Sequence, residues 1–338
     1  MKIVEKSHQY PMFQAQPISP ILLQRKSIRK VIPQFPIKRP TYEEAWEDFI
    51  ALTKLKISFM NGCWYSRSGI KGNQYIDIDK TGMKTSNYYH WMARMACDSV
   101  TSPSAIRSWY SYQFRKGLES SIYYDDNPGS ALSLRKYIPS QFRPSAAKAL
   151  IDHFNIKTFY DPCGGWGDRL VAAQASGIEY YCRDVNPLVF SGYALQQHEF
   201  GGVVDFEYKG AEVDAPIENY FDMVFTSPPY YKVEKYQGNE QSHSKYKKFD
   251  IWVNSFLVPM LEHSLKSLKS DGVLAINISD VYVDHRINDL TTPVVNFITS
   301  NFNEVTYIGY RMNKRPNSSI SKQPGVFAEP IIIGRGIK

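Results

Sequence analysis

From about residue 140 onward, short apolar runs alternate with stretches that have the 3.6-residue period of a helix. The runs typical of strands are 157–162, 178–185, 203–210, 221–227, 272–278, 304–312 and 329–335. The helical stretches are 145–154, 168–176, 186–200 and 251–269. Strands that alternate with helices pack as a mostly parallel sheet with helices on its faces, so an α/β fold is predicted here.

A stripe of apolar residues follows one face of the last helical stretch. Its members recur at helical spacing: Trp252, Phe256, Leu257, Met260, Leu261, Leu265 and Leu268. Such a stripe is typical of a helix that packs against a core. We therefore expect these residues in the interior and not in a binding site.

The N-terminal part of the chain has a different texture. Residues 1–40 carry six prolines and several basic pairs, which predicts an extended arm with short structured pieces. Thr41 and Glu44 then have the spacing of a capping box, in which each side chain binds the other's backbone N–H. This pattern predicts a helix that begins there and runs to about Phe59.

Further along, residues 60–85 alternate between apolar and polar side chains and contain glycines, which indicates loops or a small hairpin. Helical patterns follow over 87–119. We therefore predict a mainly helical N-terminal region, residues 1–136, followed by an α/β domain, residues 137–338.

Charge is unevenly distributed between the two halves. Residues 1–156 hold 22 lysines and arginines against 12 aspartates and glutamates, a net charge of +10. Residues 157–338 hold 18 against 21, a net charge of −3. A solvated basic face is one explanation of this balance. Because the basic half is also rich in tyrosine and tryptophan, we expect it to meet a nucleic acid.

Several classes of protein are disfavoured. No run of about 18 apolar residues predicts a membrane span, and the first residues lack the apolar segment of a secretory signal. The four cysteines are far apart, without CxxC or a zinc-ligand spacing. These features predict a cytoplasmic protein with free thiols, no metal site and no membrane partner.

A glycine-rich loop, "DPCGGWG", separates the first predicted strand of the α/β domain from its helix. In an open parallel sheet, ligands bind beyond the carboxyl ends of the strands, and an acidic residue at the end of the next strand, here Asp184, can hold a ribose. The loop opens with Asp161 and not with the glycine of a dinucleotide loop, and it lacks the GK[ST] ending of a P-loop. A carboxylate at this position is better suited to bind the ammonium and sulfonium of S-adenosylmethionine than to bind the phosphates of a dinucleotide. This disfavours a nicotinamide dehydrogenase.

The fourth predicted strand ends on a second motif, Ser227-Pro228-Pro229-Tyr230. Alone, two prolines after a strand indicate a rigid turn. Together with Asp161-Pro162-x-x-Gly165-x-Gly167, however, the motif resembles the S-adenosylmethionine-dependent amino-methyltransferases that act on DNA bases. The resemblance covers roughly residues 137–338 and implies a Rossmann-like methyltransferase fold.

The resemblance implies a role for each residue of the second motif. Ser227 and the Pro228 carbonyl would accept hydrogen bonds from the exocyclic amine of the target base and localise its lone pair. The two prolines would keep this acceptor geometry stiff. Tyr230 would stack on the base after it is flipped out of the duplex.

The resemblance also implies a cofactor site. The methionine end would lie near Asp161 and Pro162, enclosed by Ser140 and Phe142, while Gly165 and Gly167 allow close approach. Asp184 would take the ribose hydroxyls. Glu212 or Asp214 would accept from the adenine amine, with Glu212 slightly favoured.

Two basic segments are candidates for contact with the nucleic-acid backbone. The first follows Tyr230 and contains Lys232, Lys235, Lys245, Lys247 and Lys248. The second consists of Arg311, Lys314 and Arg315, beside the loop 316–325. The first segment would suit backbone contacts or a lid that closes over a flipped base, and equally a mobile solvated loop, whereas the loop beside the second is another candidate substrate loop.

The substrate is predicted as DNA, with RNA less favoured, which implies association with the nucleoid. Serine in the first position of the motif favours cytosine N4 over adenine N6. The alternatives are an RNA base amino-methyltransferase and a non-catalytic nucleic-acid-binding protein that retains the methyltransferase fold.

Overall fold

The computed structural model describes residues 34–100, 102–120, 127–134, 138–313 and 324–338. The proline-rich arm predicted for residues 1–40 lies mostly outside this part of the chain. The loop predicted over 316–325 also lies largely outside it. Within the described residues, no helix is long and apolar enough to cross a membrane.

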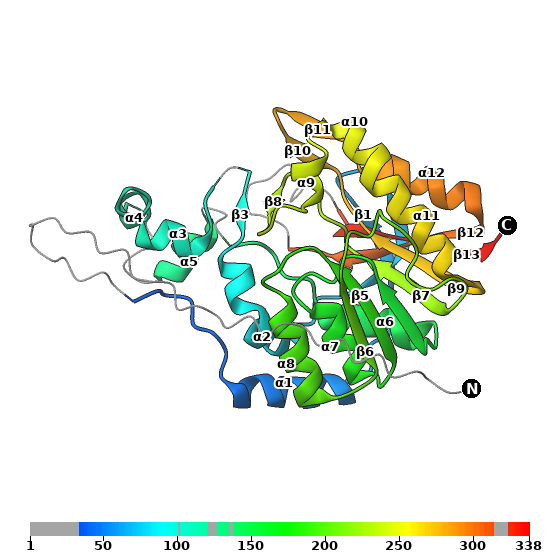
Figure 1. Cartoon of the computed structure of the whole chain (residues 1–338), viewed down its shortest axis with the longest axis horizontal. Helices are drawn as coiled ribbons and strands as arrows, with labels where there is room; N and C mark the ends of the chain where they lie inside the picture. The colour runs from blue at the N-terminus through cyan, green and yellow to red at the C-terminus, as the bar shows by residue number, and fades with distance from the viewer. Residues whose placement is uncertain (1–33, 101, 121–126, 135–137, 314–323) are drawn as a thin grey trace, which may run out of the picture. The chain divides into compact units, whose positions relative to one another are not determined.

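A parallel sheet forms the centre of the fold (Figure 1). Its strands are β4 (Thr158–Asp161), β5 (Glu179–Asp184), β6 (Val204–Tyr208), β7 (Phe221–Thr226) and β9 (Leu268–Asn277). They lie side by side in the order β6-β5-β4-β7-β9, and every neighbouring pair is parallel. The order reverses at β4, as in a doubly wound sheet, so a crevice is expected beyond the carboxyl ends of the strands at that point.

Two long C-terminal strands extend this sheet. β13 (Val326–Ile337) lies antiparallel to β9, and β12 (Phe302–Arg311) lies antiparallel to β13. The sheet is therefore mostly parallel with an antiparallel edge. This arrangement confirms the predicted Rossmann-like methyltransferase fold class.

Helices cover both faces of the sheet. One face carries α6 (Pro144–His153), α7 (Asp168–Ala175) and α8 (Phe190–Phe200), and the other carries α11 (Val258–Ser267) and α12 (Thr291–Asn301). Successive strand residues alternate between the two cores, as a pleated strand requires: Met223 and Phe225 face α6 and α7, whereas Val224 faces α11.

The helix predicted over 251–269 is divided in the structure. It consists of α10 (Phe249–Trp252), a five-residue π-helix (Val253–Leu257) and α11. The predicted apolar stripe lies in the core: Trp252, Phe256, Leu257, Met260, Leu261 and Leu268 are buried, and Leu265 packs beside them. A short helix, α9 (Ser242–Lys245), precedes this segment.

The N-terminal region contains five helices among the described residues. They are α1 (Tyr42–Lys54), α2 (Met83–Met95), α3 (Ala105–Tyr110), α4 (Tyr112–Glu119) and α5 (Pro128–Leu134). The capping box at Thr41 and Glu44 is confirmed. The first helix is shorter than predicted, because the chain becomes extended at Leu55 and leads into a strand that begins at Met60.

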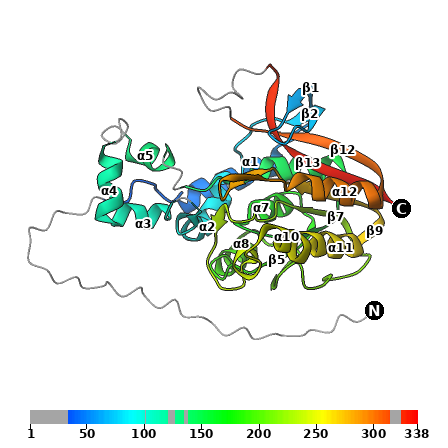
Figure 2. The same ribbon diagram turned by 90° about the horizontal axis from the view of Figure 1, so that it is seen from above.

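The predicted hairpin is present and joins the main sheet, as Figure 2 shows. Its strands β1 (Met60–Tyr65) and β2 (Lys71–Ile76) pair with β13 and β12 respectively. Residues 35–338 accordingly form one compact unit. The division predicted at residues 136 and 137 therefore does not separate compact units, and its functional meaning stays a prediction.

Two small antiparallel pairs complete the described strands. β3 (Asp98–Ser99) pairs with β8 (Glu234–Lys235), which joins the N-terminal region to the segment that follows Tyr230. β10 (Val281–Val283) pairs with β11 (Arg286–Asn288) in a hairpin between β9 and α12.

Candidate active site

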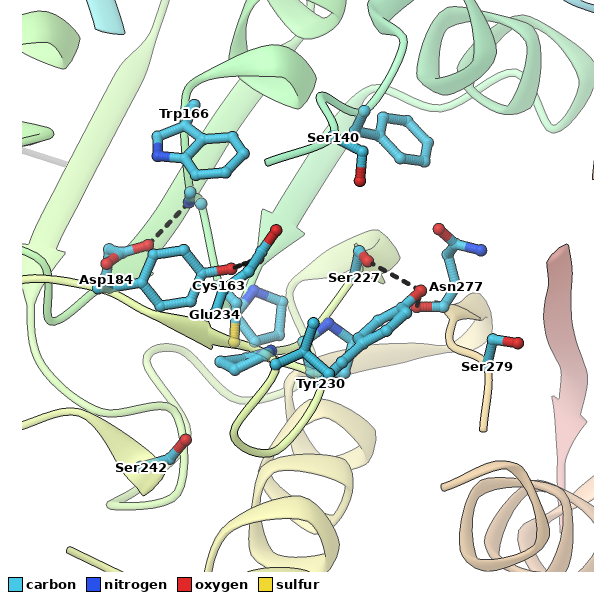
Figure 3. Close-up of a pocket in the computed structure, with 18 of the residues that line it drawn as sticks. Ser140, Cys163, Trp166, Asp184, Ser227, Tyr230, Glu234, Ser242, Asn277 and Ser279 are labelled. Carbon is cyan, nitrogen blue, oxygen red and sulfur yellow. Dashed lines mark hydrogen bonds between the residues drawn. The ribbon is translucent and has the colours of Figure 1, made fainter. Parts of the chain in front are cut away.

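A cavity of about 650 Å³ lies beyond the carboxyl ends of β4, β5, β7 and β9. Most of the predicted site residues line it: Ser140, Phe142, Pro162, Gly165, Asp184, Glu212, Ser227, Pro228, Pro229 and Tyr230. Figure 3 shows the two groups within it, with Asp184 beside the glycine-rich loop and Ser227 grouped with Tyr230 and Asn277. Asp161, Gly167 and Asp214 are not among the lining residues.

The glycine-rich loop turns sharply between β4 and α7. Gly165 has φ +60°, a conformation that side chains with a Cβ rarely adopt, and its N–H donates to Asp184 Oδ2 at 2.7 Å. A Cβ at this position would have free space around it, with its nearest neighbour at 3.8 Å. Glycine is therefore required at position 165 by the backbone conformation. Without a Cβ, it leaves free space at this point of the cavity wall.

Gly167 packs against α2 and is not among the residues that line the cavity. It begins α7 with φ +70°, and a Cβ there would lie 2.5 Å from His90 Nε2 on α2. His90 is buried, which lowers its pKa to about 4 and keeps the ring neutral. The structure places α2 against Gly167, and the predicted close approach of the cofactor at this glycine stays a prediction.

Replacing Gly167 with alanine is expected to lower the free energy of unfolding by about 2–5 kcal/mol, because it adds left-handed strain to overpacking against His90. Urea denaturation measures this change. The matched control is Gly117→Ala on α4, where an added Cβ meets nothing within 4 Å; helix propensity there favours alanine by about 0.5–1 kcal/mol. Equal effects of the two substitutions would contradict the packing role.

Asp161 forms a buried ion pair. Its Oδ2 lies 2.6 Å from Arg169 Nε and accepts from the Tyr180 hydroxyl at 2.8 Å, while the Cys163 N–H donates to Oδ1 at 3.2 Å. The Asp161 side chain is fully buried and does not reach the cavity. The structure therefore places it beneath the loop as a structural anion, and its predicted contact with a methionine ammonium stays a prediction.

Asp184 is placed where the sequence suggests, as the last residue of β5 in the cavity wall. Besides Gly165, it accepts from the N–H of Asn186 at 2.7 Å. Burial raises the pKa of Asp184 to about 6, and these two hydrogen bonds oppose that rise. At neutral pH the side chain is therefore a carboxylate with further acceptor capacity toward the cavity.

Of the two residues considered for the adenine amine, only Glu212 lies in the cavity wall, and the contact itself stays a prediction. Glu212 lines the cavity and accepts from Lys245 Nζ at 3.0 Å. Asp214 is not among the lining residues and instead pairs with Arg183 and Lys209. The contact between Glu212 and Lys245 also ties the segment after Tyr230 to the loop after β6.

The end of β7 carries a chain of polar contacts. Ser227 Oγ donates to the Tyr230 hydroxyl at 3.5 Å (Figure 3). That hydroxyl reaches the Asn277 carbonyl at 3.3 Å and Glu329 Oε2 at 3.4 Å. A serine whose O–H points to Tyr230 keeps its lone pairs free for another donor. The arrangement can therefore accept a hydrogen bond from an amine in the cavity.

Sequence reasoning missed five acidic residues of the cavity, and two of them are Glu329 and Glu234. Burial raises the pKa of Glu329 to about 7 and also raises that of Glu234, which the Tyr236 hydroxyl contacts. Glu329 can therefore take up a proton near neutral pH. The sequence signal that could have identified Glu329 is its position as a single carboxylate inside the apolar run "FAEPIII".

The N-terminal region also contributes to the site, which the sequence did not reveal. Arg67, from the turn between β1 and β2, lines the cavity. Asp168 of α7 lines it as well and accepts from Ser86 Oγ on α2 at 2.5 Å and from Gln141 Nε2 at 2.8 Å. Residues on both sides of position 136 therefore build one site.

The predicted basic segments are only partly free for other contacts. Lys232 pairs with Asp284 at 3.0 Å, and Lys245 is held by Glu212, whereas Lys235, Lys247 and Lys248 are exposed. Arg311 pairs with Asp77 at 2.7 Å. Lys314 and Arg315 lie outside the described residues.

Within the described part of the chain, no group of three or more histidine, cysteine, aspartate or glutamate side chains is arranged to hold a metal ion.

Comparisons with known proteins return no family model and no curated protein that matches this chain. Solved structures similar to it include an S-adenosylmethionine-dependent O-methyltransferase from Thermotoga maritima, 9% identical with a TM-score of 0.39 over 62% of this chain and 71% of that one. A tRNA (m1A58) methyltransferase from Aquifex aeolicus is 14% identical, with a TM-score of 0.38 over 59% and 71%. An rRNA methylase from Streptococcus thermophilus is 13% identical, with a TM-score of 0.37 over 59% and 100%. None of these likenesses is close enough to assign a family.

Proposed function

We propose that this protein belongs to the DNA amino-methyltransferases and transfers a methyl group from S-adenosylmethionine to the exocyclic amine of a flipped base. Cytosine N4 is favoured over adenine N6 because the motif begins with Ser227. The observation that carries the proposal is one cavity that joins the Gly165 loop and Asp184 to Ser227 and Tyr230. A cofactor on the first pair and an amine at the second would meet inside it.

The charges of the cavity fit this cofactor. Seven acidic residues line the cavity: Asp168, Asp184, Glu212, Glu234, Glu240, Asp280 and Glu329. Three basic residues line it: Arg67, Arg169 and Lys209. An acidic wall attracts a ligand that carries an ammonium and a sulfonium and repels the phosphates of a nicotinamide dinucleotide. Phe142, stacked on Tyr310 with ring centroids 4.9 Å apart, adds an aromatic wall.

When bound, S-adenosylmethionine supplies a methyl group activated by its sulfonium. Ser227 Oγ and the Pro228 carbonyl then hold the two N–H groups of the amine, so that its lone pair is directed at the methyl carbon. Methyl transfer would form an N–C bond at the expense of the cofactor's S–C bond, and it would leave the amine with one proton to lose. Glu329, with a pKa of about 7 and in contact with Tyr230, is the nearby group suited to take it.

Methylation of nucleosides tests the proposal directly. The protein is incubated with S-adenosylmethionine carrying an isotope-labelled methyl group, with unmodified DNA and with RNA in parallel, and the digested nucleosides are identified by mass spectrometry. Labelled N4-methylcytosine from DNA is expected, and Ser227→Ala serves as the control against a contaminating enzyme. Label in N6-methyladenine would contradict cytosine as the target base. Label in RNA alone would contradict DNA as the substrate. No labelled nucleoside, with the cofactor bound, would indicate a non-catalytic binding protein.

Cofactor affinity is expected to weaken in acid. Because burial raises the pKa of Asp184 to about 6, the carboxylate that receives the ribose hydroxyls is protonated below that pH. The dissociation constant should rise about tenfold from pH 8 to pH 5, as measured by calorimetry. Asp184→Asn should flatten this dependence. Asp168→Asn is the matched control, because Asp168 lines the same cavity with a similar pKa, and it should leave the dependence in place.

A further inference from the structure

Arg67 is a cation in the cavity wall that has no partner among the described residues. The other two basic residues of the wall are paired: Arg169 lies 2.6 Å from Asp161, and Lys209 lies 2.6 Å from Asp214. Arg67 is exposed, and within the described part of the chain no carboxylate or hydrogen-bond acceptor holds its guanidinium. A guanidinium in this state is available to a ligand.

The turn that carries Arg67 has a fixed backbone. It is a β-turn between β1 and β2, in which the Gly69 N–H donates to the Ser66 carbonyl at 3.4 Å. Gly69 has φ +81°, a left-handed conformation that glycine adopts without strain. Ser66 Oγ also donates to the Ile70 carbonyl at 3.0 Å. Because the backbone is ordered beforehand, binding a ligand at Arg67 costs little more than the entropy of its side chain.

Strand β13 places Arg67 beside the proposed base site. The guanidinium carbon of Arg67 lies 5.9 Å from the centre of the Phe327 ring. Phe327 and Glu329 line the same cavity, two residues or about 7 Å apart along the strand. Glu329 Oε2 in turn lies 3.4 Å from the Tyr230 hydroxyl. The free cation is therefore one strand repeat away from the residues at which the base is expected.

We propose that Arg67 binds the phosphate of the nucleotide whose base occupies the site at Ser227 and Tyr230. The proposal rests on the proposed function. A nucleotide carries its phosphate one sugar away from its base, which agrees with the offset of Arg67 from Glu329 and Tyr230. The planar guanidinium donates two parallel hydrogen bonds to a phosphate, and its charge strengthens both.

The charges of the cavity leave a phosphate no comparable place elsewhere in its wall. Seven acidic residues line the cavity and repel an anion. The charges of Arg169 and Lys209 are already taken up by carboxylates. A base is neutral and needs no free cation, so the phosphate is the part of the substrate that Arg67 suits. The carboxylate of S-adenosylmethionine is the other anion to be tested.

The test removes one charge from each partner of the contact. A methylphosphonate, which is neutral, replaces in turn the phosphate 5′ and the phosphate 3′ of the target nucleotide, in an oligonucleotide that the nucleoside assay shows to be methylated. With the unsubstituted protein, one of the two replacements should weaken binding about tenfold, as measured by fluorescence anisotropy. Arg67→Gln should bind the unmodified oligonucleotide about tenfold more weakly, and the same replacement should then cause no further loss. The position that responds identifies the phosphate.

The matched control is Arg335→Gln. Arg335 is half exposed and does not line the cavity, so this variant should keep both the affinity and the full response to methylphosphonate. Because the Arg67 side chain is exposed, Arg67→Gln should melt at the temperature of the unsubstituted protein. Its kcat should not change, since the phosphate is held equally before and during methyl transfer.

Three results would overturn the phosphate contact while leaving the proposed function intact. The first is no loss of affinity from either methylphosphonate with the unsubstituted protein, and the second is an undiminished loss with Arg67→Gln. The third is a weaker affinity of Arg67→Gln for S-adenosylmethionine, which would assign Arg67 to the carboxylate of the cofactor. No methylated nucleoside from DNA or RNA would overturn the proposed function and the phosphate contact with it.

Discussion

Replacing Ser227 with alanine is expected to slow methyl transfer about 100–1000-fold, the effect of removing one preorganised hydrogen-bonding group from an active site. The amine of a base is a poor nucleophile because its lone pair is delocalised into the ring. Ser227 Oγ, at the end of β7 in the cavity wall, is the side-chain acceptor placed to localise that pair. Without it the lone pair stays in the ring, and the barrier rises.

Single-turnover kinetics separates this effect from cofactor binding. The affinity for S-adenosylmethionine should not change, because Asp184 and Glu212 lie in another part of the cavity. Tyr230→Phe should cost less, about tenfold, since it keeps the ring but removes the hydroxyl that accepts from Ser227. Ser279→Ala is the matched control: it removes a hydroxyl from the same cavity and should change the rate little. A loss of cofactor affinity that accounts for the whole rate decrease in Ser227→Ala would contradict the acceptor role.

Replacing Asp161 with asparagine is expected to lower the free energy of unfolding by about 3–5 kcal/mol, because it leaves the charge of Arg169 buried without a partner. The pair is almost fully enclosed, with 0% and 5% of the two side chains exposed. The coulombic effect of Asp161 raises the pKa of Arg169 against the opposing effect of burial, so this guanidinium cannot escape the penalty by losing its proton.

Urea denaturation measures this loss, and a surface pair provides the control. Glu304 lies 3.8 Å from Arg335 with both side chains more than half exposed, so Glu304→Gln should leave the urea midpoint unchanged. Replacing Asp161 and Arg169 together by leucine and methionine should recover much of the stability. If Asp161→Asn weakened cofactor binding without destabilising the fold, Asp161 would be a ligand contact after all.

The local parts of this fold could be predicted from the sequence. The strand, turn and helix around Gly165, the capping box at Thr41 and the buried stripe that includes Phe256 are all confirmed. Each depends on residues close in the chain, through side-chain period or turn geometry. The two prolines after β7 correctly predicted that this strand ends near Thr226, because proline cannot donate a ladder hydrogen bond.

The assignment of roles to acidic residues was less complete. Asp184 and Glu212 lie in the cavity as predicted, but Asp161 lies beneath it and Glu329 went unnoticed. A carboxylate in a motif looks the same whether it faces a ligand or a buried arginine. Its environment depends on which distant side chains pack against it, here Arg169 and Tyr180 for Asp161.

An α/β sheet and the two turns at Gly165 and Pro228 follow from local sequence alone, because apolar period and proline or glycine chemistry act within a few residues. That the N-terminal region is part of the site follows only from the packing of the whole chain. His90 packs against Gly167, Arg67 lines the cavity, and the β1–β2 hairpin extends the sheet. These contacts join residues far apart in the chain, and they form because burying the combined apolar surface outweighs the entropy of bringing such distant segments together.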